Sequence, residues 1–422
     1  MSIRDLSARR GVGAQAVLLA GATGIAQLIV ALVYIAAARS TDPENFGPVV
    51  TAIALGTAAV GFIDLGTNSF WVREIARNQL SPEEFSLRGS GKLALAAILA
   101  ILWLICCRLF FEDSSYWMAG PVFLALLLNQ TTQVALRGMA RAELVAWSIL
   151  TDRLVVAIVL ASLSAAGANA AQSLWLALTA GSVTAAVMGW LVTPALSRPR
   201  LRLRLRTNPW KGSGFYGLNS IAISGQGLDI LIIGAVGGHA AAGLYGAVNR
   251  WTQPMTLLAS AFASASVPFV AHSGTWKLAW PHVRKGIWLL GVAIAVCLGV
   301  AIGATWIVDL LLGPRYAESA IVLKVLALGT IPAILNQPLA VFLQSLGQDR
   351  IVSFITLGSV VCQLALVAFI ASMFGALGAA LGFAAVQVLI LAGLSTIAIV
   401  TAKEVATQSG RPLMDVRTEK NR

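Results

Sequence analysis

The chain has 422 residues, of which 58% are hydrophobic and only 11% are charged, and its mean hydropathy is +0.81. A soluble protein carries about a quarter charged residues, so this composition excludes a soluble protein. The formal net charge of +12 is spread over stretches too short to build a folded basic face for nucleic acid. We therefore expect an integral membrane protein that does not bind nucleic acid.

Twelve apolar runs are long enough to cross a bilayer. Because about 30 Å of hydrocarbon at 1.5 Å rise per residue needs about 20 residues, each run predicts one membrane-spanning helix. The first run is too long for the apolar core of a signal peptide. The predicted spans lie near residues 12–38, 46–70, 90–110, 115–136, 144–166, 171–195, 213–236, 241–270, 284–308, 317–346, 351–373 and 377–401.

The basic residues between these spans predict the orientation of the chain. Twenty-four Lys and Arg fall in the two tails and the even-numbered loops, and three fall in the odd-numbered loops. The positive-inside rule then predicts a multi-pass protein with both termini in the cytoplasm. The basic excess also favours anionic membrane lipid as a partner. Alternatively, the Arg-Leu run at 198–206 draws a phosphate-bearing lipid towards the cytoplasmic mouth.

Two short matches indicate that the chain repeats itself. Leu128-Asn129-Gln130 in the fourth span recurs as Leu335-Asn336-Gln337 in the tenth, and Phe46-Gly47 in the second span corresponds to Ala242-Gly243 in the eighth. Each offset advances the topology by six spans, so the repeats are parallel. The predicted fold is all-α, with about 12 transmembrane helices in two pseudo-symmetric six-helix lobes around a central cavity.

This repeat predicts four segments. They are an N-terminal six-helix lobe at 1–195, a basic cytoplasmic linker at 196–212, a C-terminal six-helix lobe at 213–401 and a cytoplasmic tail at 402–422.

Charged residues inside predicted spans are candidate site residues, because each costs at least ~2.5–3.5 kcal/mol at a helix centre. Asp229 and Arg250 lie at similar depth on neighbouring spans, and we expect them to pair or to share a cavity. An ion pair that only pins the hairpin is the alternative. Lys324 adds a second cation, which suits an anionic substrate such as a diphosphate, unless it snorkels to the outer interface.

Other candidates lie near the predicted cytoplasmic mouth or among uncharged polar groups. Asp64 and Asp229 are candidates for coupling or gating. Arg73 and Arg77 can pair with Asp64 or receive a lipid headgroup at the mouth, or they are ordinary positive-inside residues. The uncharged polar candidates can hydrogen-bond to sugars or hold helices together. They are Asn129, Gln130, Asn336 and Gln337.

Catalytic and metal-binding motifs are missing from the sequence. The three histidines lie in or beside predicted loops, and no His-Glu-x-x-His, Cys-x-x-Cys or phosphate-cradling Gly-Lys-Ser/Thr loop occurs. We therefore expect no enzyme, no metal site and no cofactor.

Several motifs resemble those of the bacterial polysaccharide flippases, which translocate O-antigen and exopolysaccharide units and belong to the multidrug/oligosaccharidyl-lipid/polysaccharide exporter superfamily. The motifs cover nearly the whole chain. They are Phe46-Gly47, Asp64-Leu65-Gly66 followed by Arg73, Asp229, Gly243-Leu244-Tyr245 leading to Arg250, Pro268, and Asn336 followed by Gly347-Gln348-Asp349-Arg350.

The resemblance implies a cavity that takes a polyprenyl-diphosphate-linked glycan at the inner leaflet of the bacterial inner membrane. It further implies that Arg250, with Lys324 behind it, holds the diphosphate, and that polysaccharide assembly proteins are possible contacts. A multidrug and toxin extrusion-type cation antiporter on the same architecture remains an alternative, as does a non-transporting membrane scaffold or scramblase.

Overall fold

The computed structural model describes residues 12–110, 114–199, 208–252, 254–260, 284–345 and 348–409, together with isolated positions between 262 and 281. Among these residues the chain is helical and contains no strand. The helices of the first half are α2 (Val12–Arg39), α3 (Pro43–Asp64), α4 (Thr67–Ala76), α5 (Pro82–Phe110), α6 (Ala119–Gly138), α7 (Ala142–Ala165) and α8 (Ala170–Val192).

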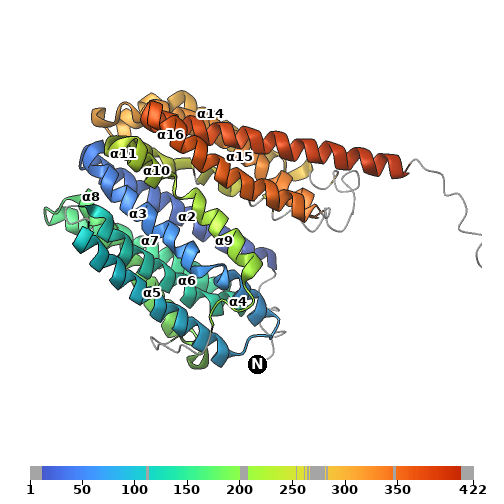
Figure 1. Cartoon of the computed structure of the whole chain (residues 1–422), viewed down its shortest axis with the longest axis horizontal. Helices are drawn as coiled ribbons and strands as arrows, with labels where there is room; N and C mark the ends of the chain where they lie inside the picture. The colour runs from blue at the N-terminus through green and yellow to red at the C-terminus, as the bar shows by residue number, and fades with distance from the viewer. Residues whose placement is uncertain are drawn as a thin grey trace, which may run out of the picture.

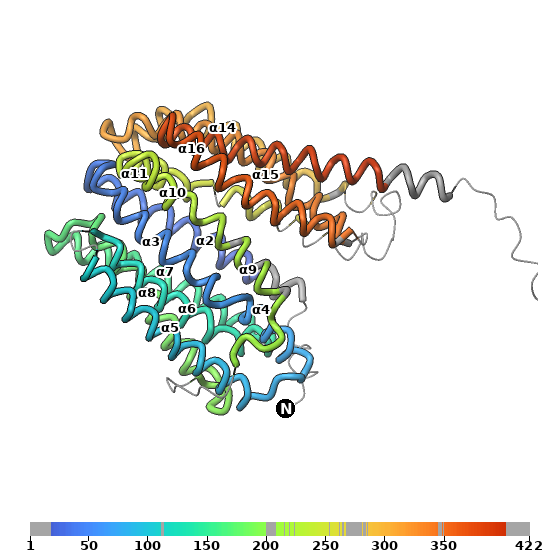
Figure 2. The backbone as a smooth tube through the Cα atoms, in the orientation of Figure 1, coloured from blue at the N-terminus to red at the C-terminus, as the bar shows by residue number. Residues whose placement is uncertain are grey.

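The second half continues with shorter and longer helices. They are α9 (Gly214–Gln226), α10 (Asp229–Val236), α11 (Gly238–Asn249), α14 (Trp288–Leu311), α15 (Ser319–Ser345) and α16 (Asp349–Ser409). Figure 1 shows one group of helices from α2 to α8 and a second group containing α10, α11 and α14 to α16. The groups meet where α3 and α11 begin, and the helices diverge towards the end where α4 lies (Figures 1 and 2).

The predicted membrane fold is confirmed. Among the described residues, nine helices are long and apolar enough to cross a membrane, and the bent pair Tyr216–Gln226 and Asp229–Val236 makes up to ten. One of the nine, Arg350–Thr401, joins the two predicted spans 351–373 and 377–401 across a kink at Phe374 and Gly375. The predicted span 241–270 begins with α11, and its later part lies partly outside the described residues.

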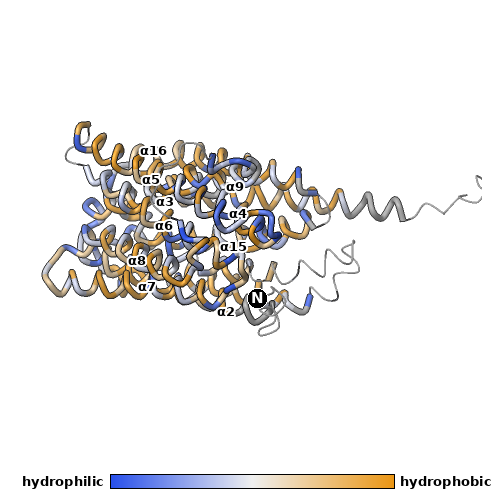
Figure 3. Tube along the Cα trace, turned by 90° about the horizontal axis from the view of Figure 1, so that it is seen from below, coloured by the Kyte–Doolittle hydropathy of each residue, from blue (hydrophilic) through white to orange (hydrophobic). Residues whose placement is uncertain are grey.

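Burial separates central from peripheral helices. Some 67% of the apolar stretch of α3 and 72% of the stretch containing α6 is buried, against 22% for α5. Large apolar side chains such as Ile302, Phe354 and Phe110 are strongly exposed on the outer helices, which is what a lipid-facing surface requires. Figure 3 shows hydrophobic colour along the outer helices and hydrophilic segments around α4 and α6. Polar groups are thus collected inside and at the ends.

The start of α3 is fixed by a cap. The Asp42 carboxylate accepts hydrogen bonds from the backbone N–H and the side-chain amide of Asn45, both at 2.9 Å, and Pro43 occupies the first turn, where its missing N–H costs nothing. The bonds from Asn45 favour the ionised carboxylate and hold the pKa of Asp42 below its ordinary value.

Just after this cap, α3 and α11 approach so closely that their backbones touch. A Cβ atom on Gly47 would overlap the carbonyl group of His239, and a Cβ atom on Gly243 would overlap the carbonyl group of Pro43. Only glycine permits such a close approach of two helix backbones.

This contact is reciprocal. At the repeat offset of 196 residues, His239 corresponds to Pro43 and Gly243 corresponds to Gly47. Gly47 contacts His239, and Gly243 contacts Pro43, so the two contacts are equivalent. A Cβ atom on Gly246 would lie 3.2 Å from the Cβ atom of Val50, its own counterpart at the same offset. Contacts in which i meets j and j meets i are the pattern of a two-fold axis. The match between Phe46-Gly47 and Ala242-Gly243 therefore marks the place where α3 and α11 pack together.

Substitution of either glycine is expected to separate the two groups of helices. Gly47→Val and Gly243→Val should each lower the free energy of unfolding by about 1–3 kcal/mol, the usual cost of overpacking, measured by thermal unfolding of the purified protein in detergent.

Gly299→Val is the matched control, because a Cβ atom at Gly299 in α14 meets no atom within 4 Å. Equal stability of all three variants would contradict the close approach of α3 and α11.

Candidate functional site

Two adjoining cavities of about 460 and 360 Å³ lie between α3, α4, α6 and α9, and both are lined by Asn68, Ser69 and Gln130. We refer to them together as the polar groove. Besides these shared residues, the polar side chains that line it are Gln133 and Arg137 from α6, Thr57 and Asp64 from α3, and Tyr216, Ser220 and Ser224 from α9.

The groove exists because the second span breaks. Leu65 and Gly66 take left-handed conformations, with φ of 45° and 70°, so α3 ends and α4 starts in a new direction. The Asp64 carboxylate caps the new helix by accepting from the Thr67 hydroxyl at 2.8 Å and from the backbone N–H of Asn68 at 3.3 Å. The predicted continuous span 46–70 is therefore wrong in this detail.

Glycines next to the break let α9 close one side of the groove. A Cβ atom on Gly66 would overlap the backbone of Tyr216, and one on Gly61 would overlap the Ser224 hydroxyl. The Ser220 hydroxyl donates to the Gly61 carbonyl at 3.2 Å. Serine hydroxyls of α9 thus reach the groove beside a bare stretch of α3 backbone.

A buried cation lies under the break. The Lys92 side chain on α5 is fully buried, and its Nζ atom donates to Asp64 at 2.8 Å, Thr67 at 3.0 Å and Asn68 at 2.7 Å. It also lies 4.4 Å from the ring centroid of Trp71, a cation–π contact. All three ammonium protons have acceptors, as a buried charge requires.

This arrangement corrects two expectations. Counting basic residues assigns Lys92 to the loop after the second span, although it falls at the start of the predicted span 90–110; it lies on α5, which begins at Pro82. Asp64 pairs with Lys92 and not with Arg73 or Arg77; Arg73 instead donates to the Tyr216 hydroxyl at 3.0 Å, and both arginines are exposed at the α4 end.

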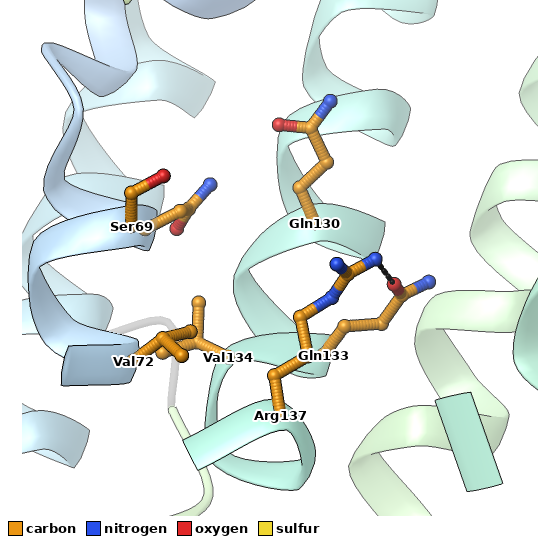
Figure 4. A pocket seen from close by; sticks show the side chains of 7 residues that line it. Ser69, Val72, Gln130, Gln133, Val134 and Arg137 are labelled. Atoms are coloured by element: carbon orange, nitrogen blue, oxygen red, sulfur yellow. Dashed lines mark hydrogen bonds between the residues drawn. The ribbon is translucent and has the colours of Figure 1, made fainter. Parts of the chain in front are cut away.

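Arg137 is the cation that faces the groove. The predicted span 115–136 leaves Arg137 in the following loop, but it lies in the last turn of α6. One N–H group of its guanidinium donates to the Gln133 side-chain oxygen at 3.1 Å. Figure 4 shows this bond, with Gln130 on the same helix and Ser69 on the facing one. The described lining of the groove therefore combines neutral hydrogen-bonding groups and the Asp64 carboxylate, which Lys92 neutralises, with one exposed positive charge.

The predicted pair Asn129 and Gln130 is split between two environments. Gln130 is exposed and lines the groove, whereas Asn129 is buried and donates to the Asp152 carboxylate on α7 at 3.0 Å. Neighbouring residues on a helix point about 100° apart, so one faces the groove and the other faces helix packing. In the second half, Asn336 is buried and donates to the Gln387 side chain at 3.1 Å.

Asp229 and Arg250, which we expect from the sequence to pair or to share a cavity, form no ion pair among the described residues. Asp229 is buried and accepts a hydrogen bond from the Tyr245 hydroxyl at 2.8 Å. Tyr245 lies on α11, the helix that follows α10. The Arg250 guanidinium instead lies 5.3 Å from the ring centroid of Tyr34 on α2. Arg250 thus touches a helix of the first group while belonging to the second.

The remaining candidates lie on α15, away from the polar groove. Lys324 is exposed on this helix, on the same side as the exposed Ile321 and Leu328. The side-chain oxygen of Gln337 is buried and has no hydrogen-bond partner among the residues that the structure describes.

Sequence signals could have found the two missed cations. Ser81-Pro82-Glu83-Glu84 has the form of a helix start, with proline in the first turn and acidic residues following it. Extending the third span back to this signal places Lys92 ten residues inside the helix. Arg137 stands eight residues after Asn129, which puts it on the same helix side as a polar stripe.

The chain matches one protein family by sequence and several solved structures by fold. The model of the polysaccharide biosynthesis protein family matches residues 12–273, and no curated protein matches the chain. Among solved structures, the lipid II flippase MurJ in an inward closed conformation is similar, with a TM-score of 0.71 and 11% identity over 90% of this chain and 86% of that one.

Two transporters of the MOP superfamily are also similar in fold. One is a multidrug resistance MATE family transporter in an inward-facing conformation, with a TM-score of 0.58 and 16% identity over 92% of this chain and 96% of that one. The other, from Pyrococcus furiosus, has a binding pocket of reverse polarity, with a TM-score of 0.53 and 14% identity over 92% and 96%. These neighbours are flippases and transporters rather than enzymes.

Removing one member of the buried pair should be costly. Lys92→Met leaves the Asp64 carboxylate buried without its cation, and the expected loss is about 3–5 kcal/mol of unfolding free energy, measured by thermal unfolding in detergent.

The double variant Lys92→Met with Asp64→Leu should recover most of that loss, because it removes both charges together. If the double variant lost as much stability as Lys92→Met and Asp64→Leu lose when added together, the two charges would not stabilise the fold as a pair.

Proposed function

The chain belongs to the polysaccharide biosynthesis protein family, and from this premise we propose that it flips a polyprenyl-diphosphate-linked oligosaccharide across the bacterial inner membrane by alternating access. The observation that carries the proposal is the polar groove, which lies among membrane-spanning helices and combines amide and hydroxyl groups with the Arg137 guanidinium. Such groups bind sugar hydroxyls and phosphate oxygens.

The charge balance of the groove favours a glycan diphosphate over an organic cation. Asp64 is the carboxylate in the described lining, and the Lys92 ammonium neutralises it at 2.8 Å. Arg137 therefore leaves the groove with a net positive charge, which repels the cations that a multidrug antiporter exports and attracts phosphate. This balance is the reason for ranking the antiporter second.

The position of the groove, at the basic end of the helices, supports loading of the substrate from the cytoplasm. It lies beside α4, where Arg73 and Arg77 are exposed, and the positive-inside rule assigns such a basic end to the cytoplasm. The glycine contact of α3 with α11 lies at the opposite end. In this proposal the sugar enters beside α4, and it leaves after Gly47 and Gly243 separate.

Different residues would act on different parts of the substrate and at different stages of the transport cycle. Gln130 and the α9 serines contact the sugar, and Arg137 contacts the diphosphate. Arg250 bridges the groups through Tyr34 in the described state and becomes available to the phosphates when they part. Asp64 and Asp229, each engaged by a donor at 2.8 Å, are the candidates for coupling to an ion gradient.

Removing the groove cation tests this proposal. Arg137→Gln should lower the export of lipid-linked polysaccharide by about tenfold or more, because a charge-assisted bond to phosphate is lost. Surface polysaccharide of a deletion strain carrying each variant is the measurement, with membrane protein level as a check on folding.

Arg108→Gln is the matched control, since Arg108 lies in the last turn of α5 and does not line the groove. Normal polysaccharide in the deletion strain would reject the flippase. Gain or loss of drug resistance instead would favour the antiporter, and no phenotype in either assay would favour a scaffold or scramblase.

A further inference from the structure

A chain of hydrogen bonds connects the groove to a buried carboxylate that no step above uses. Arg137 donates to Gln133 at 3.1 Å, Gln133 donates to Asn129 at 2.9 Å, and Asn129 donates to Asp152 at 3.0 Å. Gln133, Asn129 and Asp152 are all buried. We call this set the α6 relay.

The α6 relay has one direction. Every bond runs from donor to acceptor towards Asp152, so each amide offers its oxygen to the previous member and its N–H to the next. The three α6 members are spaced four residues apart, which places them on one helix side. The order of donors is fixed at its ends, because a guanidinium can only donate and a carboxylate can only accept.

The relay compensates charge over a distance. No carboxylate in the described part of the chain forms an ion pair with Arg137. Its positive charge instead polarises two amides whose last acceptor is the Asp152 carboxylate, and bonds in such series strengthen one another. One guanidinium N–H group is held by Gln133, and the guanidinium remains beside the groove (Figure 4).

We propose that Asp152 is a positioning residue that acts through Asn129 and Gln133 to hold the Arg137 guanidinium at the groove wall, where it binds a diphosphate. The inference rests on the proposed function only for the source of that anion. The shared chemistry is a diphosphate group, either on a lipid or free.

The surroundings of Asp152 fit a fixed acceptor. Arg153 lies 3.7 Å from it on the same helix, and a Cβ atom on Gly181 of α8 would lie 2.7 Å from its carboxylate. Glycine at this position lets α8 pack against the carboxylate and close it from lipid. The acceptor at the end of the relay is thus held from three helices.

The test measures how well inorganic pyrophosphate protects Arg137 from phenylglyoxal, an arginine reagent, in full-length protein in nanodiscs, with mass spectrometry of the Arg137 peptide. In the unsubstituted protein, pyrophosphate should slow the modification. Asp152→Asn and Asn129→Leu should each raise the concentration for half-protection by about 5- to 10-fold, since an arginine that is no longer held binds the anion less well.

Two further variants separate positioning from general damage. Asp309→Asn removes an exposed carboxylate from α14 and should leave protection unchanged. Adding Asp152→Asn to Asn129→Leu should change nothing more, because without the Asn129 amide the charge at position 152 no longer reaches Gln133, whereas independent sites add. Additive effects, or half-protection unchanged in both single variants, would overturn the relay.

Farnesyl diphosphate in place of pyrophosphate identifies the source of the anion. Protection at a lower concentration than pyrophosphate assigns the site to a lipid diphosphate, and equal concentrations assign it to a free one. Absence of protection by both would overturn the anion site. Failure of the flippase is a different result, namely normal surface polysaccharide in the deletion strain while pyrophosphate still protects Arg137.

Discussion

The arrangement of this protein depends on one contact, at which two helix backbones meet with no side chain between them. Gly47 of α3 and Gly243 of α11 each lie against the carbonyl of a residue one turn before the other glycine. Because the two contacts are related by a constant offset of 196 residues, the halves meet as counterparts about an axis near Val50 and Gly246. A contact made by a few small residues holds the two groups of helices together at one end and leaves the other end to the polar groove.

The second constraint is the cost of charge among membrane helices. Each buried carboxylate answers it differently. Asp64 accepts from Lys92, Asp152 terminates the α6 relay, and Asp229 accepts from a tyrosine hydroxyl. With the negative charges engaged in this way, Arg137 is the cation that remains exposed in the groove. The pairing of buried carboxylates with donors therefore leaves the groove positively charged, and this charge supports the proposed phosphate-bearing substrate.

The sequence predicted the helical membrane fold and most span positions, because apolar length is a strong signal in a bilayer. It also paired Phe46-Gly47 with Ala242-Gly243, and the two glycines of this match lie where α3 and α11 touch. It failed for Lys92 and Arg137, since counting basic residues assigns both to cytoplasmic loops although Lys92 falls within the predicted span 90–110, whereas both lie inside helices that extend further than their apolar stretches. It failed for Asp229 because depth alone cannot choose between Arg250 and Tyr245, both on the following span. The break at Leu65 and Gly66 was missed because apolar length does not record a change of backbone direction.

Locking the contact between α3 and α11 tests the central claim, that these helices must part during transport. A Cβ atom on Gly246 would lie 3.2 Å from that of Val50, close to the roughly 3.8 Å of a disulfide. Val50→Cys with Gly246→Cys, in a chain whose Cys106, Cys107, Cys297 and Cys362 are replaced by alanine, can be oxidised and reduced in cells. The control pair Gly329→Cys and Ala384→Cys joins α15 to α16 within one group. Polysaccharide export that stops on oxidation of the first pair, returns on reduction and continues in the oxidised control is the predicted result. Undiminished export with the first pair fully cross-linked would contradict the account.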